Sequence, residues 1–474
     1  MSSISGLDSL LSSSSAASAI DLSSILEAAT GSSSPGIDVN AAVSASITAA
    51  EAPEQAWESQ QTTLQNQTTA LNQLQTAATN LDDDMQSLNN LTGPLSATTV
   101  SSSNSGIVTA SAAPGTAVGN NIVVVSNLAT TASYSSSAVA TSTTDLPAET
   151  ITITPAGGSS TTITTGSGVN TLTDLKNAIN GDKLGVTASI ITDASGSRLA
   201  ITSNNSGSAG SFTASASGGS FGFTPADSGV DALLSVNGIS ISSASNTVTG
   251  ALPGVTLNLQ SASPGTEVNL SVQPDTSQAS SSISQFVTDY NTLIGDVNAQ
   301  FADSGSGQGV LADDPTLQTL QSALLGSLDF TSTTGSGSSS TTTSLATLGI
   351  SVNSDGTLSV DSGTLNNALQ NNFSTVQNFF QGAALNGFAN SLDQQLTNFT
   401  SPADGAFTVD LQSISTEYTT LQGDINDFQT NIITPLQAQL QSEFSKAEIA
   451  LQQLPNTIRS LDEQLGLNTN SSGG

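Results

Sequence analysis

The strongest constraint on the fold is an apolar seam that occurs near both ends of the chain. The first copy includes the stretch LNQLQTAATNLDDDMQSL (71–88), in which large apolar side chains recur three and four residues apart. On an α-helix this spacing forms the narrow seam of a coiled coil, which must be buried against a partner. The same spacing returns between residues 411 and 432, so we expect the two ends of the chain to meet as helices. The seam residues are Leu64, Leu71, Leu74, Leu81, Met85 and Leu88 in the first copy, and Ile414, Tyr418, Leu421, Ile425, Phe428 and Ile432 in the second.

The spacing also predicts which side chains meet. Within one subunit, we expect Leu71, Leu74, Leu81 and Leu88 to pack against Ile414, Leu421, Ile425 and Phe428. A second helix pair is predicted further out, where Asp38 is an N-cap candidate and the apolar residues are Val43, Ile47, Leu451, Leu454, Ile458 and Leu461. Pro435 and Pro455 interrupt the C-terminal pattern. Because an interior proline costs a helix roughly 3 kcal/mol or more, we expect breaks or kinks there.

Between residues 95 and 273 the apolar period changes to two, which predicts mainly β structure in two small units. Asn237-Gly238 favours a type I′ hairpin turn. A short helix is predicted after Thr171 and Asp174, which form a capping-box pair, and Gly181 is expected to close it. Further along, residues 331–344 are Ser/Thr/Gly-rich and are expected to form a flexible loop, and Asp361 is expected to cap one helix that continues to Phe380.

These patterns predict an α+β multidomain protein. A discontinuous helical bundle or coiled-coil leg from both chain ends would carry two inserted, mainly β head domains. The expected divisions are an N-terminal arm that is disordered on composition (1–35), a terminal coiled-coil or disordered region (36–56 and 440–474), the helical leg (57–94 and 275–439), one β head (95–133 and 230–274) and a second β head (134–229).

The charge balance excludes several classes of partner. The chain carries 37 Asp plus Glu against 5 Lys plus Arg, a net charge of −32. A nucleic-acid-binding protein needs a cationic surface, and an anionic membrane would repel this chain. We therefore expect no nucleic-acid partner and no membrane insertion. The first 175 residues contain no Lys or Arg, so the N-terminus lacks the basic region of a secretory signal peptide.

The chain offers little for catalysis. It has no His and no Cys, which removes the commonest general base and the commonest soft metal ligands. Asp82, Asp83 and Asp84 are consecutive, so on a helix they point about 100° apart and cannot converge on one ion; we interpret them as a solvated acidic face. The glycine-rich segment at 305–309 follows no predicted strand and is interpreted as a linker. We therefore expect no enzyme activity and no catalytic, metal or cofactor site.

Taken in order, the motifs resemble a known family. GIDVNAAVSASITAAEAP and QQTTLQNQTTALNQL resemble the N-terminal segment of the flagellar filament-capping, hook-associated protein 2 family. TLTDLKNAIN followed by GVTASIITDASGSRLAITSNNSG resembles the hook IN motif of flagellar axial proteins, within the second β head. DALLSVNGISISSASNTVTGALPGVTLNL, LADDPTLQTL and LATLGISVNSDGTLSVD resemble the C-terminal half of that family.

The resemblance implies a non-enzymatic homo-oligomeric ring at the distal tip of the bacterial flagellum. A pentamer is expected from the resemblance, although the sequence does not fix the number. The implied partners are flagellin, hook–filament junction proteins and an export chaperone, with type III export and no cleaved signal. The second helix pair has less support from the β heads, so we expect it to be largely unfolded in the free protein and to order against the filament or neighbouring subunits.

Two other functions remain open from the sequence. One is an adhesin whose β head binds host or substratum. The other is a sibling axial protein that lies stably at the hook–filament junction. Both are compatible with the absence of catalytic motifs.

Overall fold

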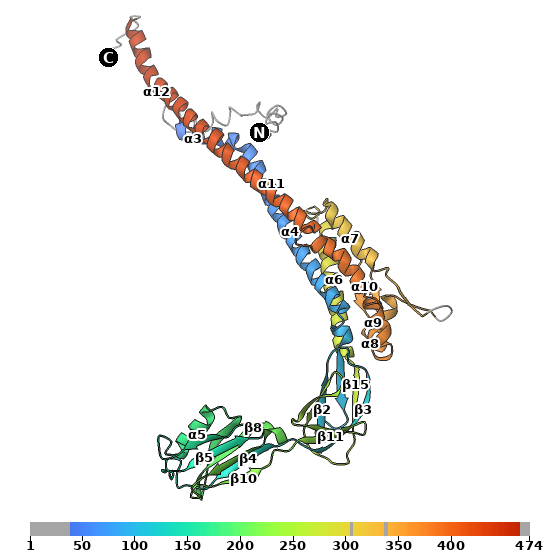
Figure 1. Ribbon diagram of the computed structural model, residues 1–474. Helices are drawn as coiled ribbons and strands as arrows, with labels where there is room; N and C mark the ends of the chain where they lie inside the picture. Colours follow the sequence, from blue (N-terminus) through green and yellow to red (C-terminus); the bar gives the residue numbers. More distant parts are fainter. Residues whose placement is uncertain (1–37, 304–306, 336–339, 465–474) are drawn as a thin grey trace, which may run out of the picture. The chain divides into compact units, whose positions relative to one another are not determined.

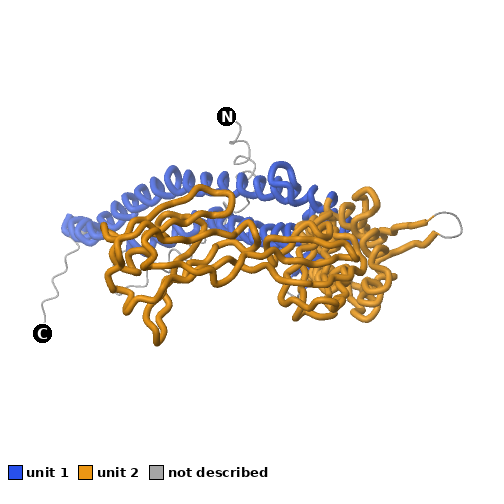
Figure 2. The backbone as a smooth tube through the Cα atoms, turned by 60° about the horizontal axis from the view of Figure 1, so that its bottom comes forward, with its two compact units in different colours: residues 1–80, 289–325, 394–474 blue, residues 81–288, 326–393 orange. Residues whose placement is uncertain are grey.

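The computed structural model describes residues 38–303, 307–335 and 340–464, so the arm predicted for residues 1–35 lies outside the described range. The chain divides into two compact units, each assembled from distant segments (Figure 2). The first unit combines Met1–Asn80, Asp289–Leu325 and Gln394–Gly474, and the second combines Leu81–Thr288 and Gly326–Asp393. Long helices from both chain ends and several antiparallel sheets confirm the predicted α+β multidomain fold.

The first unit is built from helices (Figure 1). Asp38 caps the first of them as predicted, because its side chain accepts a hydrogen bond from the backbone N–H of Ala41 at 3.0 Å. Pro315 begins another helix, and Asp314 accepts from the N–H of Thr316 at 2.8 Å. A boundary between the two units falls inside each of the helices α4, α6, α7 and α10, so the first part of each helix is assigned to one unit and the rest to the other. The helices are α3 (Val39–Ala50), α4 (Ala52–Asn89), α6 (Thr276–Phe301), α7 (Pro315–Ser327), α10 (Phe388–Thr400), α11 (Ala406–Phe428) and α12 (Thr434–Gln464).

Of the breaks or kinks expected at Pro435 and Pro455, a break occurs at neither residue. Helix α11 continues through a π-helical turn, η6 (Gln429–Ile433), directly into α12, and α12 runs on through Pro455. In the π-helical turn the N–H of Thr434 donates to the carbonyl of Gln429, five residues earlier. This wider turn changes the hydrogen-bond pattern immediately before Pro435, where a regular helix would bring the proline ring against a carbonyl of the preceding turn.

The first β region of the second unit holds two antiparallel sheets around one core. The five-stranded sheet has the order β1-β15-β3-β11-β12, and the three-stranded sheet has the order β13-β14-β2. Val123 is fully buried at the centre of the larger sheet and pairs with Val268 on one side and Val236 on the other. The strands are β1 (Thr98–Ser102), β2 (Val108–Ala112), β3 (Gly119–Asn127), β11 (Ala232–Val236), β12 (Ile239–Ser243), β13 (Thr247–Leu252), β14 (Val255–Leu259) and β15 (Val268–Pro274).

The hairpin predicted at Asn237-Gly238 is confirmed. Val236 pairs with Ile239, and the two turn residues have φ of +52° and +83°. Positive φ at both central positions is what a type I′ turn requires, and Asn-Gly tolerates it best.

The second β region has its own core, formed by two sheets and one helix. The sheets have the orders β10-β4-β8-β7 and β6-β5-β9. The predicted capping box of α5 is present: Thr171 Oγ1 accepts from the N–H of Asp174 at 3.2 Å, and Asp174 Oδ2 accepts from the N–H of Thr171 at 3.1 Å. Gly181 does not close the helix, because α5 includes it and Asp182 is still right-handed. The elements are β4 (Thr131–Ser136), β5 (Thr150–Pro155), β6 (Thr161–Thr164), α5 (Leu172–Gly181), β7 (Val186–Asp193), β8 (Gly196–Ser206), η3 (Ser208–Gly210), β9 (Phe212–Ala216) and β10 (Phe223–Asp227).

Two further predictions in this unit are corrected. In the segment expected to be a flexible loop (331–344), residues 336–339 lie outside the described range, and the described part contains two paired strands, β16 and β17. Thr333 opposes Thr342 and Thr334 opposes Thr341, and threonine favours strands despite the loop-like composition. The helix predicted from Asp361 to Phe380 is two helices, because Asn372 adopts a non-helical backbone between them. The elements are η2 (Pro94–Ser96), β16 (Ser332–Thr334), β17 (Thr341–Thr343), η5 (Ala346–Leu348), β18 (Ile350–Val352), β19 (Leu358–Val360), α8 (Ser362–Asn371) and α9 (Phe373–Phe380).

Candidate functional site

The candidate functional feature of the first unit is the contact between helices from the two chain ends. Leu64 on α4 forms a buried cluster with Leu421 and Ile425 on α11. We call this contact the inner seam; it comprises Leu64, Leu421 and Ile425 with the partly buried Trp57, Ile414 and Tyr418 packed against them. Because these positions recur at three and four residues on both helices, each helix presents one apolar edge to the other.

Polar side chains flank the inner seam and define its register. Gln61 Nε2 donates to Gln422 Oε1 at 3.1 Å, and Gln65 Nε2 donates to the hydroxyl of Tyr418 at 3.1 Å. Nearer the start of α4, the side chain of Gln429 donates to buried Glu54. Each step forward along α4 is therefore matched by a step backward along α11, which makes the pair antiparallel.

Sequence reasoning missed these flanking pairs, which also include a contact from Gln60 Nε2 to Glu417 Oε1 at 2.8 Å. A signal was available, because Gln and Glu recur beside the apolar positions on both helices. Residues at such flanking positions set partner and orientation in coiled coils.

A second contact continues in the same direction between α3 and the start of α12. Its buried residues are Val43, at 7% exposure, Ile47, at 9%, and Ile433, at 3%. We call this contact the outer seam; it comprises these three residues with Val39, Ala50, Phe428, Leu436, Leu440 and Phe444 packed against them.

The structure changes the predicted pairing in two places. The apolar partners of Leu421 and Ile425 on α4 are Leu64 and Trp57. Gln75 lines a groove with Thr408, and α11 begins at Ala406, so α11 has no position left to oppose Leu81 or Leu88. The predicted set was shifted along α4, because periodicity fixes a helix face but not the register between two helices.

The predicted partners of Val43 and Ile47 are also wrong. These two residues pack near Ile433, whereas Leu451, Leu454, Ile458 and Leu461 are 44–54% exposed. Ile432 is 50% exposed, so it lies outside both seams. The other predicted residues of α4 are buried by the fold, at no more than 1% exposure: Leu71, Leu74, Leu81, Met85 and Leu88.

The acidic run on α4 is not uniformly solvated as predicted. Asp82 is only 7% exposed, whereas Asp83 is exposed. Burial raises the pKa of Asp82 to about 7, and a hydrogen bond and charge repulsion from Asp393 act in the same direction. Gln86 opposes the shift by donating to Asp82 at 3.2 Å. The sequence pattern does not predict the contact between Asp82 and Asp393, because Asp393 lies on α10, far from Asp82 along the chain.

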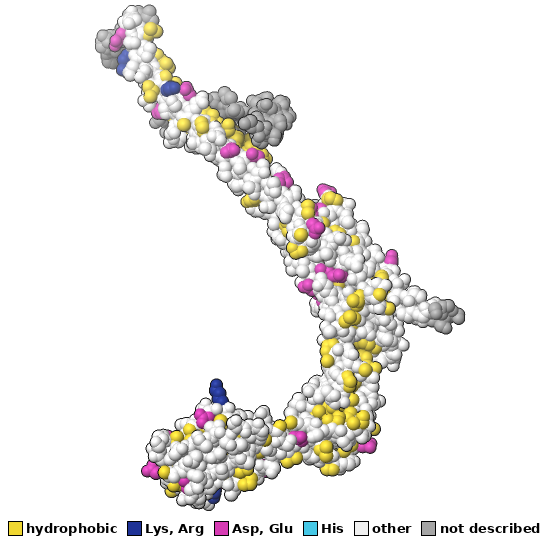
Figure 3. All heavy atoms as spheres, viewed as in Figure 1, with side chains coloured by type: hydrophobic (Ala, Val, Ile, Leu, Met, Phe, Trp, Pro, Cys, Tyr) yellow, Lys and Arg dark blue, Asp and Glu magenta, His cyan; other side chains and the backbone are white. Residues whose placement is uncertain are grey.

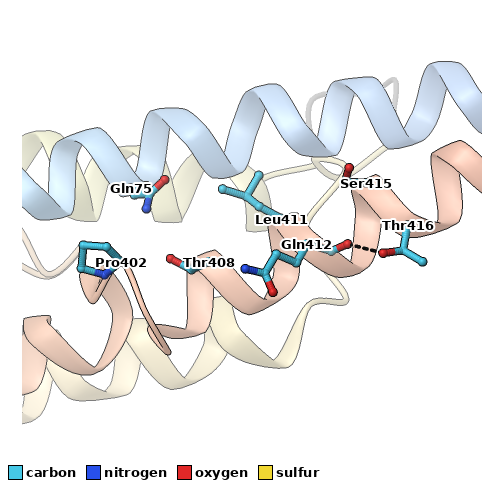
Figure 4. A pocket seen from close by; sticks show the side chains of 7 residues that line it. All are labelled: Gln75, Pro402, Thr408, Leu411, Gln412, Ser415 and Thr416. Atoms are coloured by element: carbon cyan, nitrogen blue, oxygen red, sulfur yellow. Dashed lines mark hydrogen bonds between the residues drawn. The ribbon is translucent and has the colours of Figure 1, made fainter.

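A groove of about 620 Å³ lies beside α4 and α11 (Figure 4). It is lined by uncharged side chains, which in Figure 4 come from α4, from α11 and from the segment that precedes α11: Gln75, Pro402, Thr408, Leu411, Gln412, Ser415 and Thr416. The hydroxyl of Thr416 donates a hydrogen bond to the backbone carbonyl of Gln412 at 2.8 Å. The lining therefore provides no acid, base or cation.

The described residues show no metal-binding arrangement and no membrane-spanning helix. Among them, no group of three or more His, Cys, Asp or Glu side chains is placed to hold an ion. None of the helices in the described ranges combines the length and apolar character that crossing a bilayer requires. What the described part of the first unit does present is an antiparallel helix pair with apolar seams.

Comparisons with known proteins agree with this architecture. The model for the flagellar hook-associated protein 2 N-terminus matches residues 35–132, that for its C-terminus matches residues 229–456, and the flagellin hook IN motif matches residues 150–205. The B-type flagellar hook-associated protein 2 of Pseudomonas aeruginosa is 27% identical over 433 residues, which cover 84% of this chain and 89% of that protein. Flagellar hook-associated protein 2 of Escherichia coli O157:H7 is 29% identical over 252 residues, covering 51% of this chain and 52% of that protein.

A solved structure of a flagellar cap protein is also similar to this chain. The crystal structure of the flagellar cap protein FliD D1-D2-D3 domains from Escherichia coli aligns with a TM-score of 0.57 and 28% identity. The alignment covers 73% of this chain and 99% of that one. With the family models matching on both sides of the inserted hook IN motif, this chain belongs to the flagellar hook-associated protein 2 family.

Proposed function

We propose that this protein is a structural cap at the distal tip of the bacterial flagellar filament. It forms a homo-oligomeric ring that retains exported flagellin and promotes its folding and insertion into the growing filament. The observation that carries the proposal is the match of both halves of the chain to hook-associated protein 2, together with its similarity to a solved flagellar cap protein.

The inner seam supports a mechanical role. Two helices that bury Leu64, Leu421 and Ile425 against each other bend less readily than either helix would alone, and the flanking Gln and Glu side chains hold their register. Each large apolar side chain that is fully buried contributes about 1.5–3 kcal/mol. A leg of this kind can transmit the position of the filament to the β heads through its shape, with no bond made or broken.

The subunits of the ring must meet through a heterologous, head-to-tail contact, because only such contacts close into rings. We propose that residues 57–94 and 275–439 act as the leg, and that residues 36–56 and 440–474 act as the terminal region. Residues 95–133 with 230–274, and residues 134–229, act as the two heads. Flagellin, hook–filament junction proteins and an export chaperone are the proposed partners, and export proceeds without a cleaved signal peptide.

Deletion of the gene tests the proposal. Without a cap, exported flagellin should accumulate unpolymerised in the culture medium and filaments should be short or absent. Electron microscopy of an epitope-tagged chain should place it at the filament tip. Location at the hook–filament junction, or normal filaments after deletion, would contradict the proposal.

The adhesin alternative is tested with the same strain. Wild-type filament assembly together with lost surface attachment would favour an adhesin. No contact or surface in the described residues favours that alternative.

A further inference from the structure

Two stretches of chain connect the two β regions of the second unit. One runs from the end of β3 to the start of β4, and the other runs from the end of β10 to the start of β11. They pair in one antiparallel bridge, in which the N–H of Thr130 donates to the carbonyl of Val230 at 2.9 Å. The hydroxyl of Thr130 also donates to the carbonyl of Ser228 at 2.7 Å. An isolated two-stranded ribbon is only marginally stable in water, so this bridge alone would hold the orientation of the two regions weakly.

A second contact joins the regions through two turns that belong to neither connection. Residues 206–208, between β8 and η3, meet residues 244–246, between β12 and β13. The hydroxyl of Ser206 donates to the carbonyl of Ala244 at 2.6 Å. Gly207 is buried, and a Cβ added to it would lie 2.7 Å from the Cα of Ala244. The φ of +83° at Gly207 also disfavours a side chain there, so the close approach of the two turns requires glycine.

Asp231 ties the first of these turns to the first β region. It immediately precedes β11, and its Oδ1 accepts from the N–H of Ser208 at 2.7 Å and from the hydroxyl of Ser208 at 3.0 Å. Its Oδ2 accepts from the hydroxyl of Ser242, on β12, at 3.2 Å. One carboxylate therefore holds the second β region at Ser208 and the first at Ser242. We call the whole arrangement the inter-region contact; it comprises Ser206, Gly207, Ser208, Asp231, Ser242 and Ala244.

The charge of Asp231 strengthens this contact. Hydrogen bonds from the backbone N–H and the hydroxyl of Ser208 lower the pKa of Asp231, so its carboxyl group is ionised at neutral pH. Hydrogen bonds to an ionised acceptor are roughly twice as strong as those between neutral groups. Charged side chains are scattered thinly over both β regions on the face that Figure 3 shows. Among the six residues of the inter-region contact Asp231 alone is charged, so no other member can take over its role.

We propose that the inter-region contact makes the two β regions move as one rigid body. The Thr130–Val230 bridge brings the regions together, and Asp231 and Gly207 fix the rotation of one region about that bridge. Each region has its own buried core, so loss of the contact should change the orientation of the regions and leave both folded. The proposal goes beyond the cap function and does not depend on it.

Distances between spin labels test the proposal in the full-length chain, which has no cysteine of its own. Thr249→Cys on β13 and Ser189→Cys on β7 place one label at an exposed strand position of each region. Double electron–electron resonance should give one narrow distance distribution when Asp231 is present. Asp231→Ala should broaden the distribution at least twofold. Asp231→Asn keeps an oxygen acceptor for Ser208 and should stay close to the wild-type width.

The matched control is Asp182→Ala, which removes an exposed carboxylate of the second β region and should leave the width unchanged. Equal widths in Asp231→Ala and Asp182→Ala would overturn the proposal, whether both distributions are narrow or both are broad. A broad distribution in the labelled protein that keeps Asp231 would overturn it as well.

Gly207→Ala disrupts the contact by a different route. Its methyl group would overlap Ala244, so the turn must move away and the distribution should broaden as in Asp231→Ala. Gly157→Ala is the matched control, because Gly157 has a similar φ of +71° but no neighbour within 4 Å of an added Cβ. Circular dichroism shows whether each variant is folded. Equal widths in the two folded glycine variants would contradict the proposal, and Asp231→Ala decides the question if Gly207→Ala does not fold.

Discussion

The indole ring of Trp57 on α4 meets the phenyl ring of Phe428 at the end of α11 edge to face, with centroids 5.4 Å apart and an interplanar angle of 85°. Trp57 also packs against the inner seam, and Phe428 packs against the outer seam. The pair therefore joins the two seams into one apolar contact that continues past the end of α11. It lies immediately before the π-helical turn, so the seam remains continuous where the helix geometry changes.

Replacing Phe428 with Leu should loosen this junction. Edge-to-face pairs contribute about 0.5–1.5 kcal/mol beyond the area they bury, and the variant should lose an amount in this range. Trp57 is the only tryptophan in the chain, so its fluorescence reports on this site alone. We expect the emission to shift to longer wavelength and the urea midpoint by fluorescence to fall. Val409→Ala, at a 53% exposed position of the same helix, should change neither; an unchanged spectrum in Phe428→Leu would contradict the contact.

A double-mutant cycle tests the register of the inner seam. Leu64→Ala and Leu421→Ala should each destabilise the leg by about 2–4 kcal/mol, because each removes buried methyl groups. Since the two side chains belong to one cluster, the combined variant should lose less than the sum, with a coupling of roughly 1 kcal/mol. Urea unfolding followed by far-ultraviolet circular dichroism measures all four proteins. Strict additivity would indicate that the two residues do not share a contact.

The buried carboxyl of Asp82 should make stability depend on pH. Its pKa is about 7 in the folded protein against 3.8 in the reference state, so between these values the folded state holds a proton that the unfolded chain has released. The free energy of unfolding should therefore fall as pH rises from about 4 to about 7, and stay reduced above that range. Asp82→Asn removes this titration, so its stability relative to wild type should increase as pH rises from about 4 to about 7.

The control for this prediction is Asp145→Asn, which replaces an exposed carboxylate of the same unit. Its stability relative to wild type should stay nearly constant over the same range, measured by urea midpoints at each pH. A parallel pH dependence in Asp82→Asn and wild type would show that Asp82 is ionised throughout.

Gln381 should stabilise the end of α4. Its side-chain amide is 4% exposed and donates to the carbonyls of Leu88 and Asn90, both at 3.1 Å. Gln381→Leu leaves these two acceptors without that donor and should cost about 1–3 kcal/mol. Gln381→Glu should cost more at neutral pH, because it places a carboxylate oxygen against the carbonyl oxygens.

Gln370→Leu, at an exposed position of α8, is the matched control and should be nearly neutral. Thermal unfolding by circular dichroism ranks the three variants. A Gln381→Leu protein as stable as the control would show that the two carbonyls find other donors.

Local chemistry was predictable from the sequence wherever neighbouring residues decide the structure. The Asp38 cap, the Thr171–Asp174 capping box and the Asn237-Gly238 turn all depend on residues within a few positions of each other. The apolar faces of α4 and α11 also followed from periodicity, because a helix places residues three and four apart on one side.

Properties that depend on distant residues were decided only by the tertiary structure. Periodicity left the register between α4 and α11 undetermined, and the side chains beside the seam fix Leu64 and Trp57 opposite Leu421 and Ile425. In the same way, burial and the neighbouring Asp393 on α10 raise the pKa of Asp82, and the helix continues at Pro435 through a π-helical turn. The physical reason is that a side chain's own helix fixes the direction it faces, whereas its burial and its partner depend on which segment packs against that face.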